Sequence, residues 1–339
     1  MNWLDQKKTF IGLSPMDGIT DEAFRLTQIQ VARPDVIFTE FVSAEGLAHH
    51  AVKLYSHFWF EDQERPIIAQ LFGKDPESFY IASQIVLHLG FDGVDINMGC
   101  PAKTVTQHGS GASLIDKPDL AKEIILAVKR GVADYSSAKN LNHLHLPPKV
   151  TTALLPLAKK AVSHPTISLK TRLGVLSPKL DWISFLSQFN LDLITLHGRT
   201  LKQGYSGQAD WQLINQAKEI IKNNCASKFF GNGDLNSLKQ AQEYLDQYGL
   251  DGVLIGRAAM GNPWVFSDHQ PTWLEKFNAL IYHTEQFQRL YPNSRLDPLR
   301  RHYLLYTHSH PKAKELRQKL VTLTTIDQLL ALEPEFLNC

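Results

Sequence analysis

The sequence has few cysteines, no long apolar run and almost no net charge. Its three cysteines, Cys100, Cys225 and Cys339, are widely separated and include no CxxC pair. This usage indicates neither a disulfide framework nor a zinc site. No segment approaches the roughly 20 apolar residues that span a bilayer, and the first residues, MNWLDQKKTF, lack the apolar stretch of a signal peptide. We therefore expect no metal, no membrane association and a cytoplasmic location.

The balance of charge excludes a protein that binds polyanions over its whole surface, because 35 Lys and Arg face 34 Asp and Glu. One segment is basic: from Arg289 to Lys319, eight cations stand against Asp297 and Glu315. These cations are Arg289, Arg295, Arg300, Arg301, Lys312, Lys314, Arg317 and Lys319. Aromatic side chains that could stack on bases are interleaved with them, namely His302, Tyr303, Tyr306 and His308. The segment predicts a nucleic-acid surface; the alternative is a solvated helical face.

Short apolar runs alternate with helix-like segments from residue 10 to about residue 265. The strand-like runs are Phe10 to Pro15, Val36 to Phe41, Ile67 to Phe72, Val94 to Asn97, Thr166 to Thr171, Leu193 to His197, Lys228 to Gly231 and Gly252 to Ile255. Nearly continuous apolar strands are typical of a parallel sheet covered by helices. Eight such alternations predict an α/β protein with a (β/α)8 TIM barrel, whose usual size is about 250 residues.

The pattern changes after Pro263 and Trp264, where only helical spacing remains, over Leu274 to Leu290, Leu299 to His308 and Lys312 to Leu332. We therefore expect a catalytic barrel over residues 1–268 and a small all-helical domain over residues 269–339. The connection at about 131–165 is too long for an ordinary loop. We interpret it as a surface insertion with room for one short helix.

The apolar run at Val94 to Asn97 ends in a glycine-rich loop in which Pro101 follows Cys100. Proline removes a backbone donor and disfavours helical geometry before it, so the strand must end here and leave the thiol at the C-terminal mouth of the barrel. Gly109 and Gly111 then permit close approach of the backbone to a ligand. This arrangement favours an active-site loop; the alternative is a buried structural cysteine.

Other strand ends also carry polar residues, at the positions where TIM barrels place their active sites. They are Ser14 to Gly18, Gln70, Asn97, Lys170, Arg172, His197 and Arg199. Lys170 lies in an otherwise apolar strand, and a buried anionic ligand would explain it. The last two strands end in Gly231 to Asp234 and Gly256 to Ala259, which with Arg257 predict a phosphate site. A planar phosphate-bearing cofactor, flavin mononucleotide (FMN), fits this set.

Several motifs carry a resemblance to a known family: PMDGITDEAFR, DINMGCPAK, GSGASL, LKTRLG, LHGRT, YSGQADW, NGD and IGRAAMGNPW. They resemble those of the tRNA-dihydrouridine synthases, flavoenzymes that reduce uridine in tRNA. The resemblance implies that FMN is held by Pro15, Met16, Asp17, Gln70, Lys170, His197, Asn232, Gly233, Asp234, Gly256 and Arg257. It implies Cys100 as proton donor and places Asn97, Lys103 and Arg199 near the uridine pocket. We add Arg172 in the barrel, and Arg301 and Arg317 in the helical domain, as tRNA contacts.

The implied reaction is hydride transfer from N5 of reduced flavin to C6 of uracil, with a proton from Cys100 to C5 and NADPH as electron donor. A thiol with an ordinary pKa near 8.5 is protonated at neutral pH and can act as an acid. We expect a monomer without an obligate protein partner. Two alternatives remain: a flavin barrel that acts on a small molecule such as dihydroorotate or an enone, and a non-catalytic tRNA-binding module.

Overall fold

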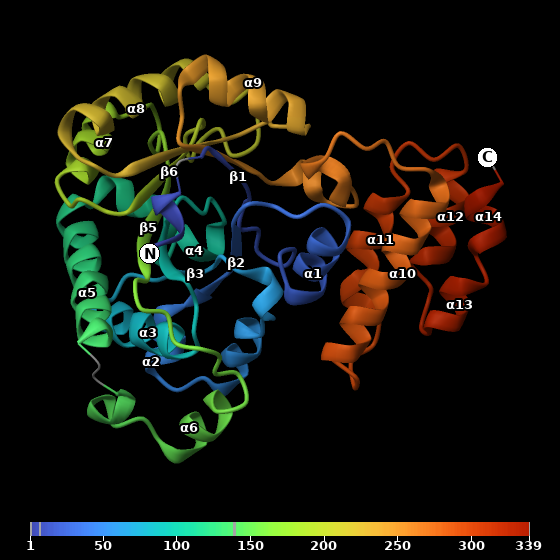
Figure 1. The fold of residues 1–339 in the computed structure, drawn as a ribbon, viewed down its shortest axis with the longest axis horizontal. Helices are drawn as coiled ribbons and strands as arrows, with labels where there is room; N and C mark the ends of the chain where they lie inside the picture. The colour runs from blue at the N-terminus through green and yellow to red at the C-terminus, as the bar shows by residue number, and fades with distance from the viewer. Residues whose placement is uncertain (1, 7, 138–139, 339) are drawn as a thin grey trace.

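The computed structural model describes residues 2–6, 8–137 and 140–338; Cys339 lies outside them. In this part of the chain eight parallel strands close into a barrel in sequence order, seen in Figure 1 with its helices around it. The strands are β1 Phe10–Leu13, β2 Ile37–Ser43, β3 Ile67–Phe72, β4 Gly93–Met98, β5 Thr166–Arg172, β6 Leu193–His197, β7 Lys228–Asn232 and β8 Gly252–Ile255. The predicted TIM barrel is confirmed.

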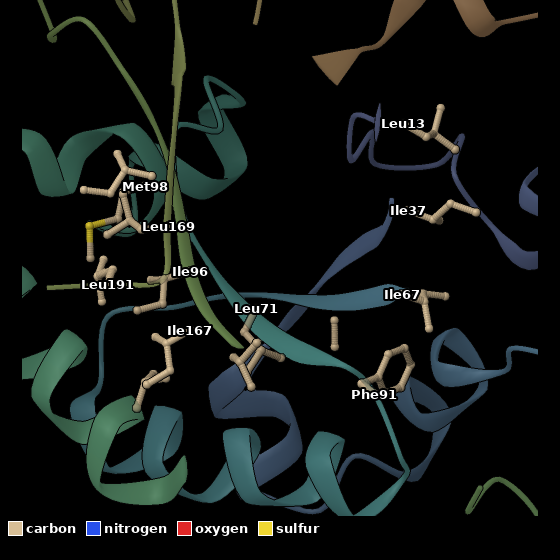
Figure 2. Packing of buried hydrophobic residues seen from close by; sticks show 14 of the residues in the cluster. Leu13, Ile37, Ile67, Leu71, Phe91, Ile96, Met98, Ile167, Leu169 and Leu191 are labelled. Atoms are coloured by element: carbon tan, nitrogen blue, oxygen red, sulfur yellow. The ribbon is translucent and has the colours of Figure 1, made fainter. Parts of the chain in front are cut away.

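Helices connect the strands along the outside of the barrel. They are α1 Glu22–Val31, α2 Ala44–Ala48, α3 Pro76–His88, α4 Lys103–Thr106, α5 Pro118–Ser136, α6 Pro148–Leu154, α7 Leu180–Ser187, α8 Trp211–Asn224 and α9 Leu238–Tyr248. The outward residues of each strand pack against them, and Figure 2 shows Ile96, Ile167 and Leu71 in this layer. Successive residues of a strand point to opposite faces of the sheet. The neighbours of these three residues along their own strands therefore point into the barrel.

The inward residues near the start of the strands are apolar and fill the floor of the barrel. Phe10, Phe38, Ile68, Leu193, Phe230 and Leu254 form one buried cluster with Leu4 and Val36. Trp3 closes it from below, with its ring centroid 5.2 Å from that of Phe10. Above this floor, the largest opening found among the described residues lies at the opposite, C-terminal end of the strands.

The connection at about 131–165 contains the last residues of α5, the short helix α6 and a 3-10 turn at Leu141–Leu144. The connection after β2 differs from the expected strand–helix alternation, because its only α-helix is the five-residue α2, followed by the 3-10 segment Val52–Phe58. No helix among the described residues is both long and apolar enough to cross a membrane.

The C-terminal region is helical, and Figure 1 shows it beside α1 at one side of the barrel. Its helices are α10 Trp273–Leu290, α11 Arg300–Tyr306, α12 Ala313–Leu320, α13 Ile326–Leu330 and α14 Glu333–Leu337. The continuous helix expected over Lys312 to Leu332 is two helices, because Thr325 caps a new helix through its bond from the Gln328 amide. Arg289 pairs with Glu61 of the barrel at 2.7 Å.

The expectation that the interleaved aromatics stack on bases is wrong for His302, Tyr303 and Tyr306. All three are buried in the structure, and the His302 ring lies 5.5 Å from Phe24 of α1, centroid to centroid. The His302 ring packs α11 against α1 of the barrel, whereas the Tyr303 and Tyr306 hydroxyls lie 3.1 and 3.4 Å from Thr284 and His283 of α10. The three rings are therefore used in packing within the protein. Of the four, His308 alone is exposed.

Candidate active site

A cavity of about 1290 Å³ opens at the C-terminal ends of the strands and extends to the helical region. Most of the residues predicted for cofactor, catalysis and substrate line it: Pro15, Met16, Asp17, Gln70, Asn97, Cys100, Lys170, Arg172, His197, Asn232, Gly233, Asp234, Gly256 and Arg257. Lys103, Arg199, Arg301 and Arg317 do not line it. The structure thus brings together residues at or just after the ends of seven strands, from Pro15 to Arg257, which are 242 positions apart in the sequence.

The register of the sheet explains this convergence. Asn97 pairs with Lys170 across β4 and β5, Arg172 with His197 across β5 and β6, and His197 with Asn232 across β6 and β7. Residues paired in register on adjacent strands share a face, and here that face is the inside of the barrel. The polar residues therefore form the rim of the same interior whose floor is apolar.

Cys100 is held by hydrogen bonds to the backbone on both sides of it. Asn97 Oδ1 accepts from the amides of Gly99 at 3.1 Å and Cys100 at 2.9 Å, an Asx turn that ends β4. The Cys100 carbonyl accepts from Ala112 N at 3.1 Å. Gly111, at φ +61°, permits this contact, because a Cβ there would lie 2.9 Å from the Cys100 carbonyl oxygen. The thiol is thereby fixed at the cavity wall.

The surroundings of Cys100 favour a protonated thiol. Burial raises the pKa of the Cys100 thiol above its ordinary value, and the nearby Asp17 carboxylate raises this pKa further. The amide of Ala102 and the cations Arg172 and Lys170 act in the opposite direction without reversing the shift. A thiol of this kind is suited to donating a proton and poorly suited to nucleophilic attack.

The part of the wall formed by Lys170, Arg172 and Arg257 is cationic and fits an anionic ligand. Burial lowers the pKa of Lys170 to about 8, helped by Arg172 and opposed by Asp95. Burial, and then Lys170, Arg172, Arg199 and Arg257, lower the pKa of His197 well below its ordinary range, so this imidazole is neutral. Its Nδ1 is buried and has no hydrogen-bond partner among the described residues. An unsatisfied buried nitrogen beside a desolvated ammonium is the environment that a polar, negatively charged cofactor would complete.

The last two strand ends form a narrow glycine-lined edge of the cavity. Gly233 has φ +132°, a conformation that other residues rarely adopt. The Asp234 carboxylate accepts from Arg257 at 2.9 Å and from Arg199 at 2.6 Å. Arg257 also lies over the ring of Tyr205, 5.0 Å from its centroid. At this edge the Arg257 guanidinium lies next to glycine backbone that lines the cavity. A cation beside accessible backbone amides fits the phosphate group of FMN.

Two of the predicted substrate arginines are bound mainly to loop backbone. Arg172 donates to the carbonyls of Gly99, Thr200 and Gly204 at 2.6, 3.3 and 3.1 Å. Arg199 is 2% exposed and donates to the carbonyls of Ser206 and Gly207. Both guanidinium groups tie together the loops around the cavity, and Arg172 in addition lines it.

The predicted contacts of the helical region are more exposed. Arg301 donates from Nη1 to the Gly18 carbonyl at 2.6 Å, so it links α11 to the loop after β1. Arg317 donates to the Thr307 hydroxyl at 3.0 Å. Arg295 and Arg300 both pair with Asp297, and Lys319 pairs with Glu335. Part of the basic excess is therefore neutralised locally.

Sequence reasoning missed several residues of the site. Asp95 is inward on β4 and buried below the cavity, and its position between Val94 and Ile96 in an alternating strand was the available signal. Tyr205, 63% exposed, and Lys276 of the helical region also line the cavity, as does His308, which the sequence suggested only as a ring that could stack on bases. Nothing in the spacing of Lys276 or His308 indicates proximity to strand ends, since the chain folds back to bring them there. Among the described residues no group of three or more His, Cys, Asp or Glu could hold a metal ion.

A closed barrel with a cationic cavity, a fixed thiol at its mouth and appended helices defines a TIM-barrel protein equipped for chemistry on a bound anion. The chain belongs to the dihydrouridine synthase family, whose profile, described as "Dihydrouridine synthase (Dus)", it matches over residues 12–140 and 144–338. Family membership supports the reduction of uridine in tRNA as the general activity and a flavin as the cofactor.

Known proteins similar to this chain agree with the family. The "Probable tRNA-dihydrouridine synthase" of Staphylococcus aureus (strain MRSA252) is 32% identical over 98% of this chain and 95% of that protein. The "Probable tRNA-dihydrouridine synthase 2" of Bacillus subtilis (strain 168) is 29% identical over 98% of this chain and 96% of that protein. The solved structure of histamine dehydrogenase from Rhizobium sp. 4-9 has a TM-score of 0.50 at 11% identity, covering 81% of this chain and 48% of that one, and shows likeness of fold alone.

Proposed function

We propose that this protein reduces the C5=C6 bond of a uridine in tRNA to 5,6-dihydrouridine, with FMN as its bound cofactor and NADPH as electron donor. The observation that carries the proposal is the fixed, half-buried Cys100 thiol, whose pKa is raised, in one cavity with Lys170 and His197. A general acid and an anion site that share a cavity are the two parts that this reduction requires.

The residues that would hold FMN come from the ends of different strands. Lys170 and His197 would face the planar ring, and the glycine-lined edge at Gly233 and Gly256, with Arg257, would hold the phosphate. When bound, FMN supplies the hydride that adds to C6 of the uracil ring. The buried Lys170 ammonium would offset negative charge on the ring, because its pKa of about 8 keeps it protonated at neutral pH.

Cys100 would supply the second hydrogen. Its S–H bond breaks as a C–H bond forms at C5, and the thiolate then takes a proton from solvent through the open side of the cavity. Carbon C5 becomes basic once C6 has received hydride, because the electron pair is delocalised onto the C4 carbonyl. A thiol whose pKa is raised is protonated before this step, as a general acid must be.

The helical region would position the tRNA. The cavity continues from Cys100 to Lys276, His308 and Ser309 of this region, so a nucleotide at the barrel mouth would lie beside it. The uridine must leave its stack to reach the thiol, as in other enzymes that act on a base. Arg317, which lies beyond the cavity, would contact the phosphate backbone.

The test is mass spectrometry of unmodified tRNA after incubation with the purified protein, FMN and NADPH, with nuclease mapping of any fragment that gains two hydrogens. We expect a gain at a defined uridine. A protein that holds FMN and oxidises NADPH but leaves every tRNA fragment unchanged would contradict the proposal. That result would favour a flavin barrel acting on a small molecule.

A further inference from the structure

The Cys100 loop is connected to the interior of the barrel by one continuous chain of hydrogen bonds. Asp95 Oδ2 accepts from Gln70 Nε2 at 2.6 Å, and Gln70 Oε1 accepts from Asn97 Nδ2 at 2.8 Å. Asn97 Oδ1 then accepts from the amides of Gly99 and Cys100. The other oxygen of Asp95 accepts from the Ser168 hydroxyl at 2.6 Å. All four side chains are buried.

The register of the strands builds this chain. Asp95 pairs with Gln70 of β3 on one side and with Ser168 of β5 on the other. Asn97 lies two residues further along β4, on the same inward face. The chain therefore runs upward inside the barrel from Asp95, below the cavity, to the thiol loop at its rim.

The carboxylate decides the direction of every bond in the chain. A side-chain amide carries both a donor and an acceptor and can be turned end for end, whereas an ionised carboxylate only accepts. Because Asp95 accepts from Gln70 Nε2, Gln70 must present its oxygen to Asn97. Asn97 must then present its own oxygen to the backbone amides of Gly99 and Cys100. An inverted Asn97 would bring its NH2 group against two N–H donors and break the turn.

We propose that Asp95 is a positioning residue for the reaction: through Gln70 and Asn97 it fixes the backbone at Cys100 and hence the place of the thiol in the cavity. Asp95 does not line the cavity, and its side-chain hydrogen bonds go to Gln70 and Ser168. This inference rests on the proposed role of Cys100 as the proton donor. The proposal gives Asp95 a function that the sequence motif alone does not indicate.

The substitution Asp95→Asn tests the proposal. It keeps the shape of the side chain but replaces a carboxylate, which only accepts hydrogen bonds, with an amide, which can also donate them. We expect single-turnover reduction of tRNA by the pre-reduced holoenzyme to slow at least about tenfold. Flavin reduction by NADPH and FMN content should stay within about twofold of wild type. The matched control is Ser168→Ala, which removes the other donor to the same carboxylate but leaves the chain to Cys100 intact; it should slow the tRNA step less than twofold.

A double-mutant cycle separates a positioning role from a general structural one. If Asp95 acts through the thiol, Asp95→Asn should cause no further slowing in a Cys100→Ala background. Equal slowing in both backgrounds would overturn the proposal and assign Asp95 to the flavin side, through Lys170. Where Asp95→Asn does not fold, Asp95→Leu removes the acceptor at the start of the chain with an apolar side chain of similar volume, at a position that does not line the cavity.

A second measurement needs neither tRNA nor turnover. Alkylation of the folded holoenzyme by iodoacetamide, resolved by peptide mass spectrometry, gives the reactivity of Cys100 relative to the half-buried Cys225. We expect Asp95→Asn to change this ratio several-fold and Ser168→Ala to leave it unchanged. An unchanged ratio in Asp95→Asn would overturn the proposal. Wild-type tRNA reduction by Cys100→Ala would instead contradict the proposed function, whatever the alkylation ratio.

Discussion

The cavity of the barrel and the core of the helical region both enclose histidines whose pKa values are lowered by burial, but the two settings differ in what lies beside the rings. His197 faces a cavity in which Lys170, Arg172 and Arg257 also lie. His283 and His302 face each other at 4.7 Å between ring centroids and pack against Phe24. The first ring lines an open cavity, whereas the other two are enclosed in the helical core; each setting leaves buried ring nitrogens without a hydrogen-bond partner among the described residues.

Cations show the same contrast. Lys170 stands in the barrel interior, far from any acid except Asp95, and its pKa is lowered. In the helical region Arg300 and Lys319 pair with acids at the surface, where ion pairs contribute little to stability. We therefore expect the barrel cation to meet a ligand, whereas half of the eight cations between Arg289 and Lys319 are already paired with acids of the protein. The experiments below test this distinction.

The largest effect should follow from Cys100→Ala, which removes the proposed acid from the cavity. Bound FMN and its reduction by NADPH should be retained, and the single-turnover rate of tRNA reduction should fall about 100-fold or more, the usual contribution of a general acid. Cys225→Ala is the matched control, because this second half-buried thiol lies outside the cavity lining. Wild-type rates in Cys100→Ala would show that the proton comes from another group.

Lys170→Met should come next, because it removes the buried ammonium that the anionic ligand would meet. We expect the dissociation constant of FMN, measured by fluorescence quenching, to rise about tenfold, or about 1.4 kcal/mol. The matched control is Lys218→Met: this lysine is also buried, but it donates to the Tyr248 carbonyl at 2.7 Å outside the cavity. Equal loss of FMN in both variants would mean that the effect is one of stability.

Much of the barrel could be predicted from sequence, because apolar strands and polar strand ends are local patterns. The ends of β3 and β6 agree with the sequence to the residue, and Gln70 and His197 reach the cavity as expected. The role of Asp95 could not be read in this way. It depends on which residues of β3 and β5 stand beside it, and register between strands is a property of the closed sheet.

In the helical region the role of the aromatic residues was mispredicted although the sequence contained the information needed. The count of basic residues drew attention away from the spacing of the apolar ones. Leu299, His302, Tyr303 and Tyr306 follow the i, i+3, i+4, i+7 spacing of one helical face, and all four are buried. The spacing indicates an apolar face turned toward the core, and the cations Arg300 and Arg301 lie off it. The helical periodicity predicts the burial of these rings better than the charge count does, because burying apolar rings stabilises the fold whatever the charge of the neighbouring residues.

The histidine pair of the helical region predicts a loss of stability in acid. Burial lowers the pKa of His302 to about 3 and that of His283 well below its ordinary value. The unfolded chain takes up protons below its pKa of about 6.5, whereas the folded chain does not. The stabilisation is therefore complete above pH 6.5 and is lost as pH falls from 6.5 toward 3.

Protonation of His302 in the unfolded chain should lower the free energy of unfolding by about 2 kcal/mol between pH 7 and pH 5, and His283 should act in the same direction. Urea denaturation of wild type and His302→Phe at both pH values measures this change. The variant, whose ring suits the aromatic surroundings, should lose about 2 kcal/mol less than wild type over the same interval. An identical loss would show that protonation of other groups governs the acid transition.

The smallest effect is expected for single cations of the helical surface, where each phosphate contact contributes one released counterion. Arg317→Glu should weaken tRNA binding a few-fold and reduce the slope of log K against log salt by roughly 0.7 to 0.9. NADPH oxidation should be unchanged, because Arg317 does not line the cavity. Lys239→Glu, an exposed charge reversal on α9, is the matched control and should alter neither the affinity nor the slope.

Arg301 sharpens the same test, because it differs from Arg317 in touching the barrel. Its bond to the Gly18 carbonyl lies next to Asp17 and Met16 of the cavity wall. Arg301→Glu should therefore weaken tRNA binding as Arg317→Glu does and, in addition, change the FMN affinity by up to about twofold. If both reversals leave the affinity and the salt slope at wild-type values, the basic excess of the tail is balanced within the protein. Recognition of tRNA must then come from the cavity itself, which Lys276 and His308 line together with Cys100.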